Sequence, residues 1–381
     1  MIAVRSLRYA ALLCGLCVSP CLAADQPKFA PLLQSAVDKH TLAGAVLLVA
    51  DKDHTLALET VGYADVAAQE PMRADSLFWI ASQSKPITAT ALMMLVDEGK
   101  VKLDDPVENY LPEFKGIWLA AERDAEHVLL KKPSHPITVR NLLSHTSGLP
   151  FKSELEEPTL DLFPLEARVR SYAMTPLDFD PDSSYRYSNA GINTAGRIIE
   201  VVSGMSYEDF LDKRLFEPLG MKDTTFWPNE EQLSRLAKSY KPTAANDGLE
   251  EITIGQLKYP LDDRRRQPMP AGGLFSTARD VARFCQMVLA GGVFEGKRYL
   301  SEEAVREMTK RQTPQTVKES YGLGWGTGDG AFGHGGAFAT NMSIDSGRGL
   351  ITIYMVQHAG PPEVGQLYGV FVKAAQEAFA K

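Results

Sequence analysis

The amino-acid sequence predicts an α/β (α+β) fold, in which a mostly antiparallel sheet is flanked by helices and both ends of the chain contribute strands. Residues 43–50 and 55–63 are apolar segments rich in branched side chains, and the turn-like Asp-Lys-Asp between them predicts a β-hairpin. Residues 337–344 and 350–357 repeat this pattern around a glycine-containing turn, and residues 362–380 have the periodicity of an amphipathic helix.

Helical patterns interrupted by prolines dominate the middle of the chain, including residues 139–144 and 191–203. Because the strand patterns lie on both sides of this region, we expect the two chain ends to share one sheet. The sequence therefore predicts a sheet-plus-helix part made of residues 25–100 and 260–381, into which a mainly helical part, residues 101–259, is inserted.

The first 24 residues have the pattern of a cleaved signal peptide. Arg5 and Arg8 precede an apolar stretch, residues 11–23, which ends in small residues. This stretch is shorter than the roughly 20 residues that a membrane-spanning helix needs. We therefore expect export to the periplasm or the medium, without a stable membrane anchor.

Charge and cysteine content narrow the function classes. The formal net charge is −8, and loss of Arg5 and Arg8 with the signal would make it about −10, which disfavours nucleic acids and anionic membranes as partners. Only Cys285 would remain, so no internal disulfide is possible. Cys285 shares one helical face with Val281, Phe284 and Val288, which predicts a buried side chain rather than a nucleophile.

Ser82 and Lys85 stand three residues apart at the start of a predicted helix, residues 82–99. This spacing brings the lysine amine within reach of the serine hydroxyl. A serine needs an adjacent base to become a good nucleophile, and a lysine that is partly desolvated can serve as that base. Taken alone, the pair also fits a capping serine beside a solvated lysine.

Tyr187-Ser188-Asn189 lies in a proline- and serine-rich loop before another predicted helix. Tyr187 is a candidate for relaying a proton between Ser82 and the leaving group, and Asn189 for holding Lys85 or a substrate carbonyl. The alternative for this segment is an ordinary turn tyrosine.

His334-Gly335-Gly336 precedes the predicted strand at residues 337–344. The two glycines allow a substrate to approach the backbone closely, and the Ala337 N–H is a candidate partner for the Ser82 N–H in an oxyanion hole. A second H-x-G sequence begins at His358, so the pattern is not specific by itself.

In combination, these segments resemble the S-x-x-K, Y-x-N and K-T-G series of serine β-lactamases and penicillin-binding proteins. Order and spacing are most similar to class C β-lactamases, family VIII esterases and D-aminopeptidases, and residues 141–149 and 271–277 also look like segments of this group. The resemblance implies a β-lactamase/transpeptidase-like fold with its site between the two parts. In the third motif, however, His334 and Gly335 replace the lysine and hydroxyl residue that hold a substrate carboxylate in β-lactamases.

The sequence therefore predicts a serine hydrolase that cleaves an ester, amide or peptide bond through an acyl-enzyme, with Ser82, Lys85 and Tyr187 catalytic and Asn189, His334, Gly335 and Gly336 contacting substrate. It leaves open whether Lys85 or Tyr187 takes the first proton. One alternative is a β-lactamase or D-alanyl-D-alanine carboxypeptidase, and another is a penicillin-binding sensor that is acylated without turnover.

Other chemistries receive little support. His127, His135 and His145 match no zinc-ligand spacing, and we expect structural or surface roles for them. The chain contains neither a G-x-S-x-G elbow nor a phosphate-binding glycine loop. We expect no metal and no cofactor.

Overall fold

The computed structural model describes residues 28–328, 330–360 and 363–379. The predicted signal peptide lies outside the described residues. Within them, no helix is both long and apolar enough to cross a membrane.

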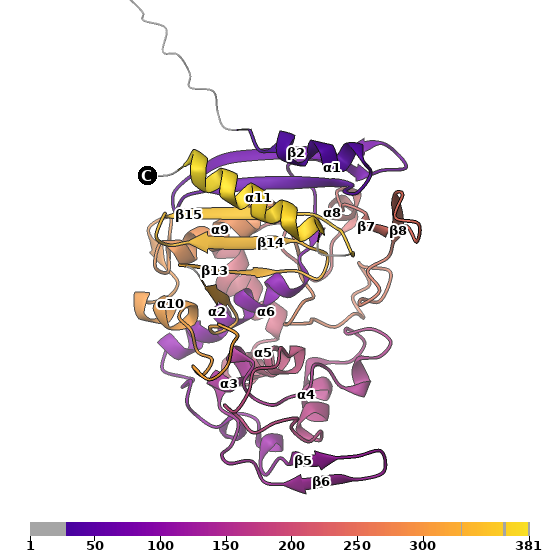
Figure 1. Ribbon diagram of the computed structural model, residues 1–381. Coiled ribbons are helices and arrows are strands. Elements are labelled where there is room, and N and C mark those ends of the chain that lie inside the picture. Colours follow the sequence, from indigo (N-terminus) through magenta and orange to yellow (C-terminus); the bar gives the residue numbers. More distant parts are fainter. Residues whose placement is uncertain (1–27, 329, 361–362, 380–381) are drawn as a thin grey trace, which may run out of the picture.

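A seven-stranded antiparallel sheet joins the two ends of the chain (Figure 1). The central pairing is between a strand near the start and a strand near the end, with Leu48 opposite Ile353. The predicted fold class is thereby confirmed, while the residue boundaries proposed for the two parts stay a prediction. In sheet order the strands are β12 (Gly326–Gly328), β13 (Ala331–Gly335), β14 (Asn341–Asp345), β15 (Leu350–Met355), β1 (Gly44–Ala50), β2 (Thr55–Asp65) and β3 (Glu70–Pro71).

Strand β1 is apolar at every position because both faces of the sheet are covered. Leu47 packs in a core with Leu33 of α1 (Ala30–Asp38) and Phe371 of α11 (Glu363–Ala378). Its neighbour Leu48 points the other way, into the main core, against α9 (Ala278–Leu289) and the helical region beyond. Alternate side chains of a strand face opposite sides, so neither face of β1 tolerates a polar residue.

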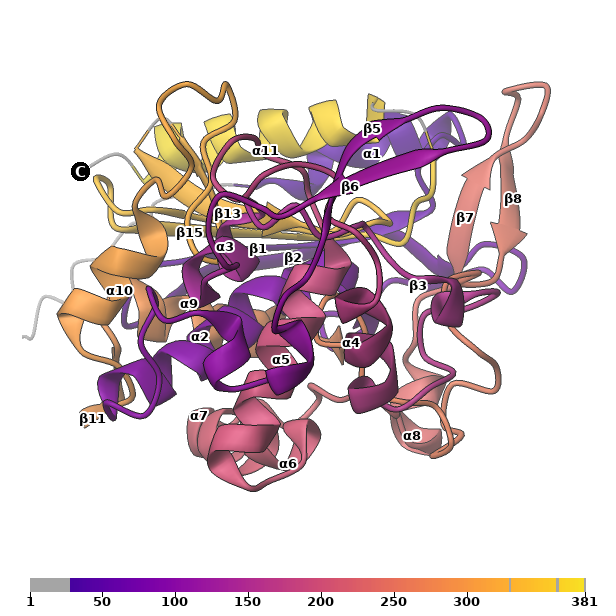
Figure 2. The same ribbon diagram turned by 90° about the horizontal axis from the view of Figure 1, so that it is seen from below.

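The helical region lies below the sheet in Figure 1 and is turned towards the viewer in Figure 2, which shows the molecule from below. Helices α2 (Ser84–Asp97) and α5 (Asn189–Ser203) pack against each other at its centre, and α2 also contacts β13 of the sheet. The other α-helices are α3 (Val139–Ser144), α4 (Leu165–Ala173), α6 (Tyr207–Leu211), α7 (Glu217–Leu219), α8 (Glu230–Ser234) and α10 (Glu302–Thr309). Four two-stranded sheets complete the strands: β4–β9 (Phe78–Trp79, Phe275–Ser276), β5–β6 (Leu119–Arg123, Val128–Lys131), β7–β8 (Ser239–Pro242, Leu249–Ile252) and β10–β11 (Val293–Phe294, Lys297–Arg298).

One strand assignment from the sequence is wrong. The pattern predicts a single strand over residues 337–344, directly after His334. In the structure His334 itself lies in β13, and a turn over residues 336–340 separates it from β14. Apolar periodicity cannot locate this turn because Phe338 and Ala339 continue the apolar run, although Ala339 takes a positive φ of 66°, which is incompatible with an extended strand. The prediction for Cys285 is confirmed, since its side chain is fully buried in α9.

Candidate active site

Ser82 lies in a short 3-10 turn (Ala81–Gln83) that leads directly into α2. The residue before it, Ala81, has a positive φ of 45°, which is unusual for a side chain other than glycine. Buried contacts hold this conformation: Ser84 Oγ donates to the Ala81 carbonyl at 2.7 Å and accepts from Leu274 N at 3.3 Å. The Ser82 side chain is thus kept partly exposed at the start of the helix.

The Lys85 side chain is completely buried, and its amine lies within hydrogen-bond distance of three oxygen atoms. Its Nζ lies 3.1 Å from Ser82 Oγ, 2.9 Å from Asn189 Oδ1 and 2.7 Å from the Ala271 carbonyl oxygen. No carboxylate among the described residues forms an ion pair with it. Burial therefore dominates and places the pKa of Lys85 well below its ordinary value of 10.5.

Tyr187 lies directly across from this lysine. The Lys85 Nζ is 4.5 Å from the centre of the Tyr187 ring, and α5 begins two residues later with Asn189. Burial raises the pKa of Tyr187, and the interaction of its phenol with the Ser82 hydroxyl only partly offsets this effect. Tyr187 is consequently a neutral phenol, able to donate a proton but poorly suited to hold a negative charge.

Ala271 and Asn193 belong to the site although no motif pointed to Asn193. Asn193 is completely buried one helical turn after Asn189, and its Oδ1 accepts from Ala271 N at 3.1 Å. Its Nδ2 donates to the Tyr172 hydroxyl at 3.0 Å and to Glu156 Oε1 at 3.3 Å. A buried polar network therefore holds Ala271, whose carbonyl accepts the hydrogen bond from Lys85.

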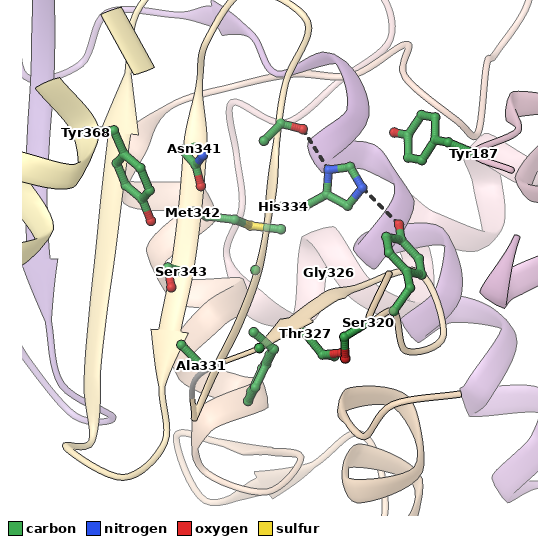
Figure 3. A pocket seen from close by; sticks show the side chains of 15 residues that line it. Tyr187, Ser320, Gly326, Thr327, Ala331, His334, Asn341, Met342, Ser343 and Tyr368 are labelled. Carbon is green, nitrogen blue, oxygen red and sulfur yellow. Dashed lines mark hydrogen bonds between the residues drawn. The ribbon is translucent and has the colours of Figure 1, made fainter. Parts of the chain in front are cut away.

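His334 lies at the end of β13 and faces Tyr187 and Tyr321 (Figure 3). Its Nδ1 lies 2.7 Å from the Gly335 carbonyl, which can only accept, so Nδ1 carries the proton. Nε2 must then accept from the Tyr321 hydroxyl at 2.9 Å. Burial and the nearby Lys85 lower the pKa of His334 to about 3, which makes the ring neutral.

The two backbone N–H groups predicted to form an oxyanion hole have no hydrogen-bond partner among the described residues. Neither the Ser82 N–H nor the Ala337 N–H donates to another group within the described part of the chain. Ala337 lies exposed in the turn after β13. Gly336 is required there, because a Cβ would meet Thr340 Oγ1 at 2.1 Å and the Ile80 carbonyl at 2.6 Å.

A cavity of about 450 Å³ opens beside Tyr187 and His334 and runs over the sheet edge towards α11 (Figure 3). Its floor is bare backbone at several small residues of β12 and β13. No lining residue carries an acid, lysine or arginine side chain; they are Tyr187, Ser320, Tyr321, Gly326, Thr327, Gly328, Ala331, Phe332, Gly333, His334, Gly335, Asn341, Met342, Ser343 and Tyr368. The cavity is therefore suited to an uncharged group.

The candidate metal-ligand histidines of the sequence, His127, His135 and His145, do not form a cluster among the described residues. His127 lies near Asp124 on the β5–β6 hairpin, and His135 near Asp182. His145 is buried beside Tyr187. The one cluster of potential metal ligands in the described regions is Asp51, Asp53 and His54, on the turn between β1 and β2.

Comparison with known proteins agrees with this fold. Residues 29–376 match the Beta-lactamase family model. The chain is 30% identical over 364 residues to esterase EstB of Burkholderia gladioli, covering 89% of this chain and 84% of that protein. It is 33% identical over 329 residues to penicillin-binding protein 4 of Amycolatopsis lactamdurans, covering 82% and 80%.

Among solved structures, EstCE1, a hydrolase with promiscuous acyltransferase activity, superimposes with a TM-score of 0.75 at 24% identity, covering 93% of this chain and 97% of that one. This likeness shows that the folds agree. The family match over nearly the whole chain establishes that this protein belongs to the Beta-lactamase family, and its relatives include an esterase and a penicillin-binding protein.

Proposed function

We propose that this protein is a serine hydrolase that cleaves an ester or amide bond through an acyl-enzyme on Ser82. The contact between Ser82 Oγ and the buried Lys85 amine, whose pKa lies well below its ordinary value, carries the proposal, since it pairs a hydroxyl with a candidate base inside a desolvated site. Relatives named as an esterase and a penicillin-binding protein support the same class of chemistry.

Lys85 is the better first base of the two candidates. Burial lowers the pKa of Lys85 and raises that of Tyr187, so the amine is free to accept a proton while the phenol keeps its own. The Ser82 proton moves to Lys85 Nζ as Oγ bonds to the substrate carbonyl carbon. The oxyanion that forms is held by the Ser82 and Ala337 N–H groups.

Collapse of this intermediate breaks the bond to the leaving group, which receives a proton from Tyr187, and Tyr187 recovers one from Lys85. Water then attacks the acyl-enzyme, and transfer of its proton back through the same groups releases the acid and restores Ser82. Asn189 keeps the amine aimed at Ser82 throughout.

We further propose that the substrate has no carboxylate beside the bond that is cleaved. His334 is neutral and already hydrogen-bonded at both nitrogens, and Gly335 offers no hydroxyl. The adjoining cavity contains no cationic side chain. Neutral esters and amides suit this surface better than β-lactams or peptides that end in a free carboxylate.

Export through a cleaved signal peptide, to the periplasm or the medium, is the location we propose. The pattern of residues 1–24 supports it. The intact mass of protein recovered from the periplasmic fraction tests this point, because retention of those residues would contradict it.

Covalent labelling tests the nucleophile. We expect a fluorophosphonate to add once to the wild-type protein and not to S82A, as measured by intact mass, and S82A to lose turnover of p-nitrophenyl butyrate. S320A removes a hydroxyl from the neighbouring cavity and should be labelled like the wild type. An adduct without steady turnover of any substrate would favour the sensor alternative, and labelling of S82A would contradict the assignment.

The pH dependence tests Lys85 as the base. Protonation of the amine at low pH removes the acceptor, so kcat/KM should fall as the pH drops through the pKa of Lys85, which lies well below 10.5. K85R keeps the charge but cannot lose its proton, and should lower kcat by at least about 100-fold at all pH values. K100R, an exposed exchange of the same type, should have no effect. Substantial activity in K85R would rule out this role.

Substrate selection tests the neutral surface. The double variant H334K/G335T supplies a cation and a hydroxyl, and a Cβ at Gly335 has room, with its nearest neighbours at 3.4 and 3.6 Å. Its kcat/KM for nitrocefin relative to p-nitrophenyl butyrate should rise at least about tenfold, or roughly 1.4 kcal/mol. H127K adds the same charge on an exposed hairpin and should leave the ratio unchanged. An unchanged ratio in H334K/G335T would show that this pair does not set the preference.

A further inference from the structure

His145 is a buried histidine that the proposed reaction does not use directly. It ends α3, a six-residue helix whose first turn is closed by a capping box between Thr138 and Asn141. The side chain of His145 is 1% exposed, and its backbone is left-handed, with φ 60° and ψ 30°. The chain therefore turns sharply at this position and directs the imidazole inward.

Backbone hydrogen bonds tie this segment to the loop that carries Tyr187. Ser188 N donates to His145 Nδ1 at 3.2 Å, and Arg186 N donates to the His145 carbonyl at 3.0 Å. Asp182 N donates to the Thr146 carbonyl, also at 3.0 Å. The residues on either side of Tyr187 are thus both bound to His145.

The imidazole also contacts the tyrosine ring itself. The centre of the His145 ring lies 4.6 Å from that of Tyr187 and 4.7 Å from that of Tyr321, which in turn binds His334. Since Nδ1 accepts the Ser188 N–H, the proton of the neutral ring sits on Nε2, which has no hydrogen-bond partner within the described residues. Only the Nδ1 edge of the ring therefore makes a directed contact.

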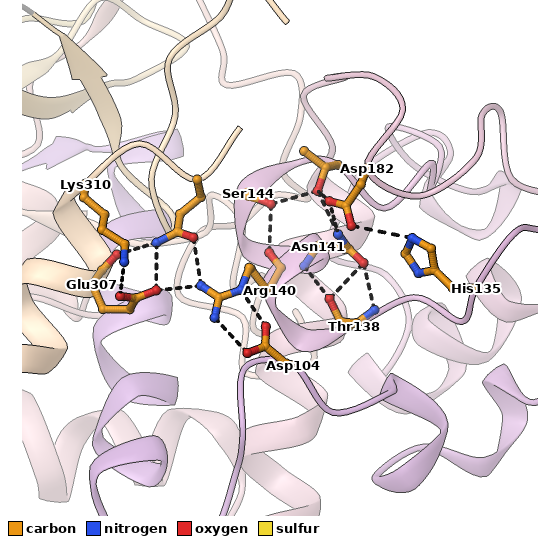
Figure 4. Close-up of polar contacts among 11 residues, drawn as sticks. Asp104, His135, Thr138, Arg140, Asn141, Ser144, Asp182, Glu307 and Lys310 are labelled. Atoms are coloured by element: carbon orange, nitrogen blue, oxygen red, sulfur yellow. Dashed lines mark hydrogen bonds and ion pairs between the residues drawn. The ribbon is translucent and has the colours of Figure 1, made fainter. Parts of the chain in front are cut away.

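Helix α3 is itself fixed in place by polar contacts of two side chains in its first turn (Figure 4). Arg140 binds Asp104 and also Glu307 of α10. Asn141 Nδ2 donates to Asp182 Oδ1 at 2.7 Å, in the same loop that leads to Tyr187. His145 thus projects from a rigid support, and its position is transmitted to the loop.

We propose that His145 is the positioning residue of Tyr187: its Nδ1 holds the Ser188 N–H, and its ring packs against the phenol ring, so that the hydroxyl stays directed at Ser82 and Lys85. This role rests on the proposed function, in which Tyr187 transfers the proton. It assigns no proton transfer to His145 itself.

Position 145 allows the hydrogen bond to be removed without changing the backbone. Asparagine and glycine both adopt left-handed conformations readily, but only asparagine offers an acceptor close to the position of Nδ1. H145N should keep kcat for p-nitrophenyl butyrate within about threefold of the wild type, whereas H145G should lower it at least about tenfold with little change in KM. H145A removes the same acceptor and replaces H145G if that variant does not fold. Circular dichroism and thermal unfolding verify the fold of each variant.

A double-mutant cycle with Y187F separates positioning from general support of the fold. If His145 acts through Tyr187, H145G should lower kcat by no more than about twofold in the Y187F background. An equal loss in both backgrounds, or an H145N variant as impaired as H145G, would overturn the proposal. Wild-type activity in Y187F would contradict the proposed function, and with it any role of His145 through Tyr187, whereas labelling of Ser82 tests the nucleophile independently.

Discussion

The hydrogen bonds of the buried Lys85 amine are the interactions on which the rest of the site depends. They join three segments that are far apart in the chain: the start of α2, the start of α5 and the loop before β9. An amine buried without a carboxylate partner resists protonation, because its cation would lose the solvation of water and gain no ion pair in return. The same burial that is unfavourable for a charged lysine lowers the pKa of the amine, which favours the proposed role of Lys85 as a base.

Much of the surrounding structure holds the acceptors of this amine in place. Asn193 fixes Ala271 from behind, and its own amide is bound by Tyr172 and Glu156. Arg168, also fully buried, donates to the Pro268 carbonyl in the same loop. A polar network of this kind is stabilising only when its members are paired, so removal of one member should disturb the others. The apolar sheet, covered on both faces, provides the rigid frame for these contacts.

The sequence predicted the elements that depend on local pattern. Apolar runs and helical periodicity located β1 and α5 to within about two residues, and the spacing of Ser82 and Lys85 at a helix start sufficed to place the two together. The turn at residues 336–340 was missed because apolar residues continue through it. The sequence pattern also did not indicate Asn193, Tyr321 or the positioning contacts of His145. These depend on tertiary contacts between distant segments, which periodicity does not report. The neutral state of His334 likewise follows only from its burial and its two hydrogen bonds.

The most direct test of this account is a measurement of the Lys85 pKa in the folded protein. Nuclear magnetic resonance of protein with ¹³C-labelled lysine side chains reports each amine as the pH is changed, and K85R assigns the signal. If Lys85 is the base, its titration midpoint should lie well below the ordinary value of 10.5. A Lys85 signal that titrates at or above that value would show a charged amine in the resting site, and would contradict the central role of Lys85 as the base.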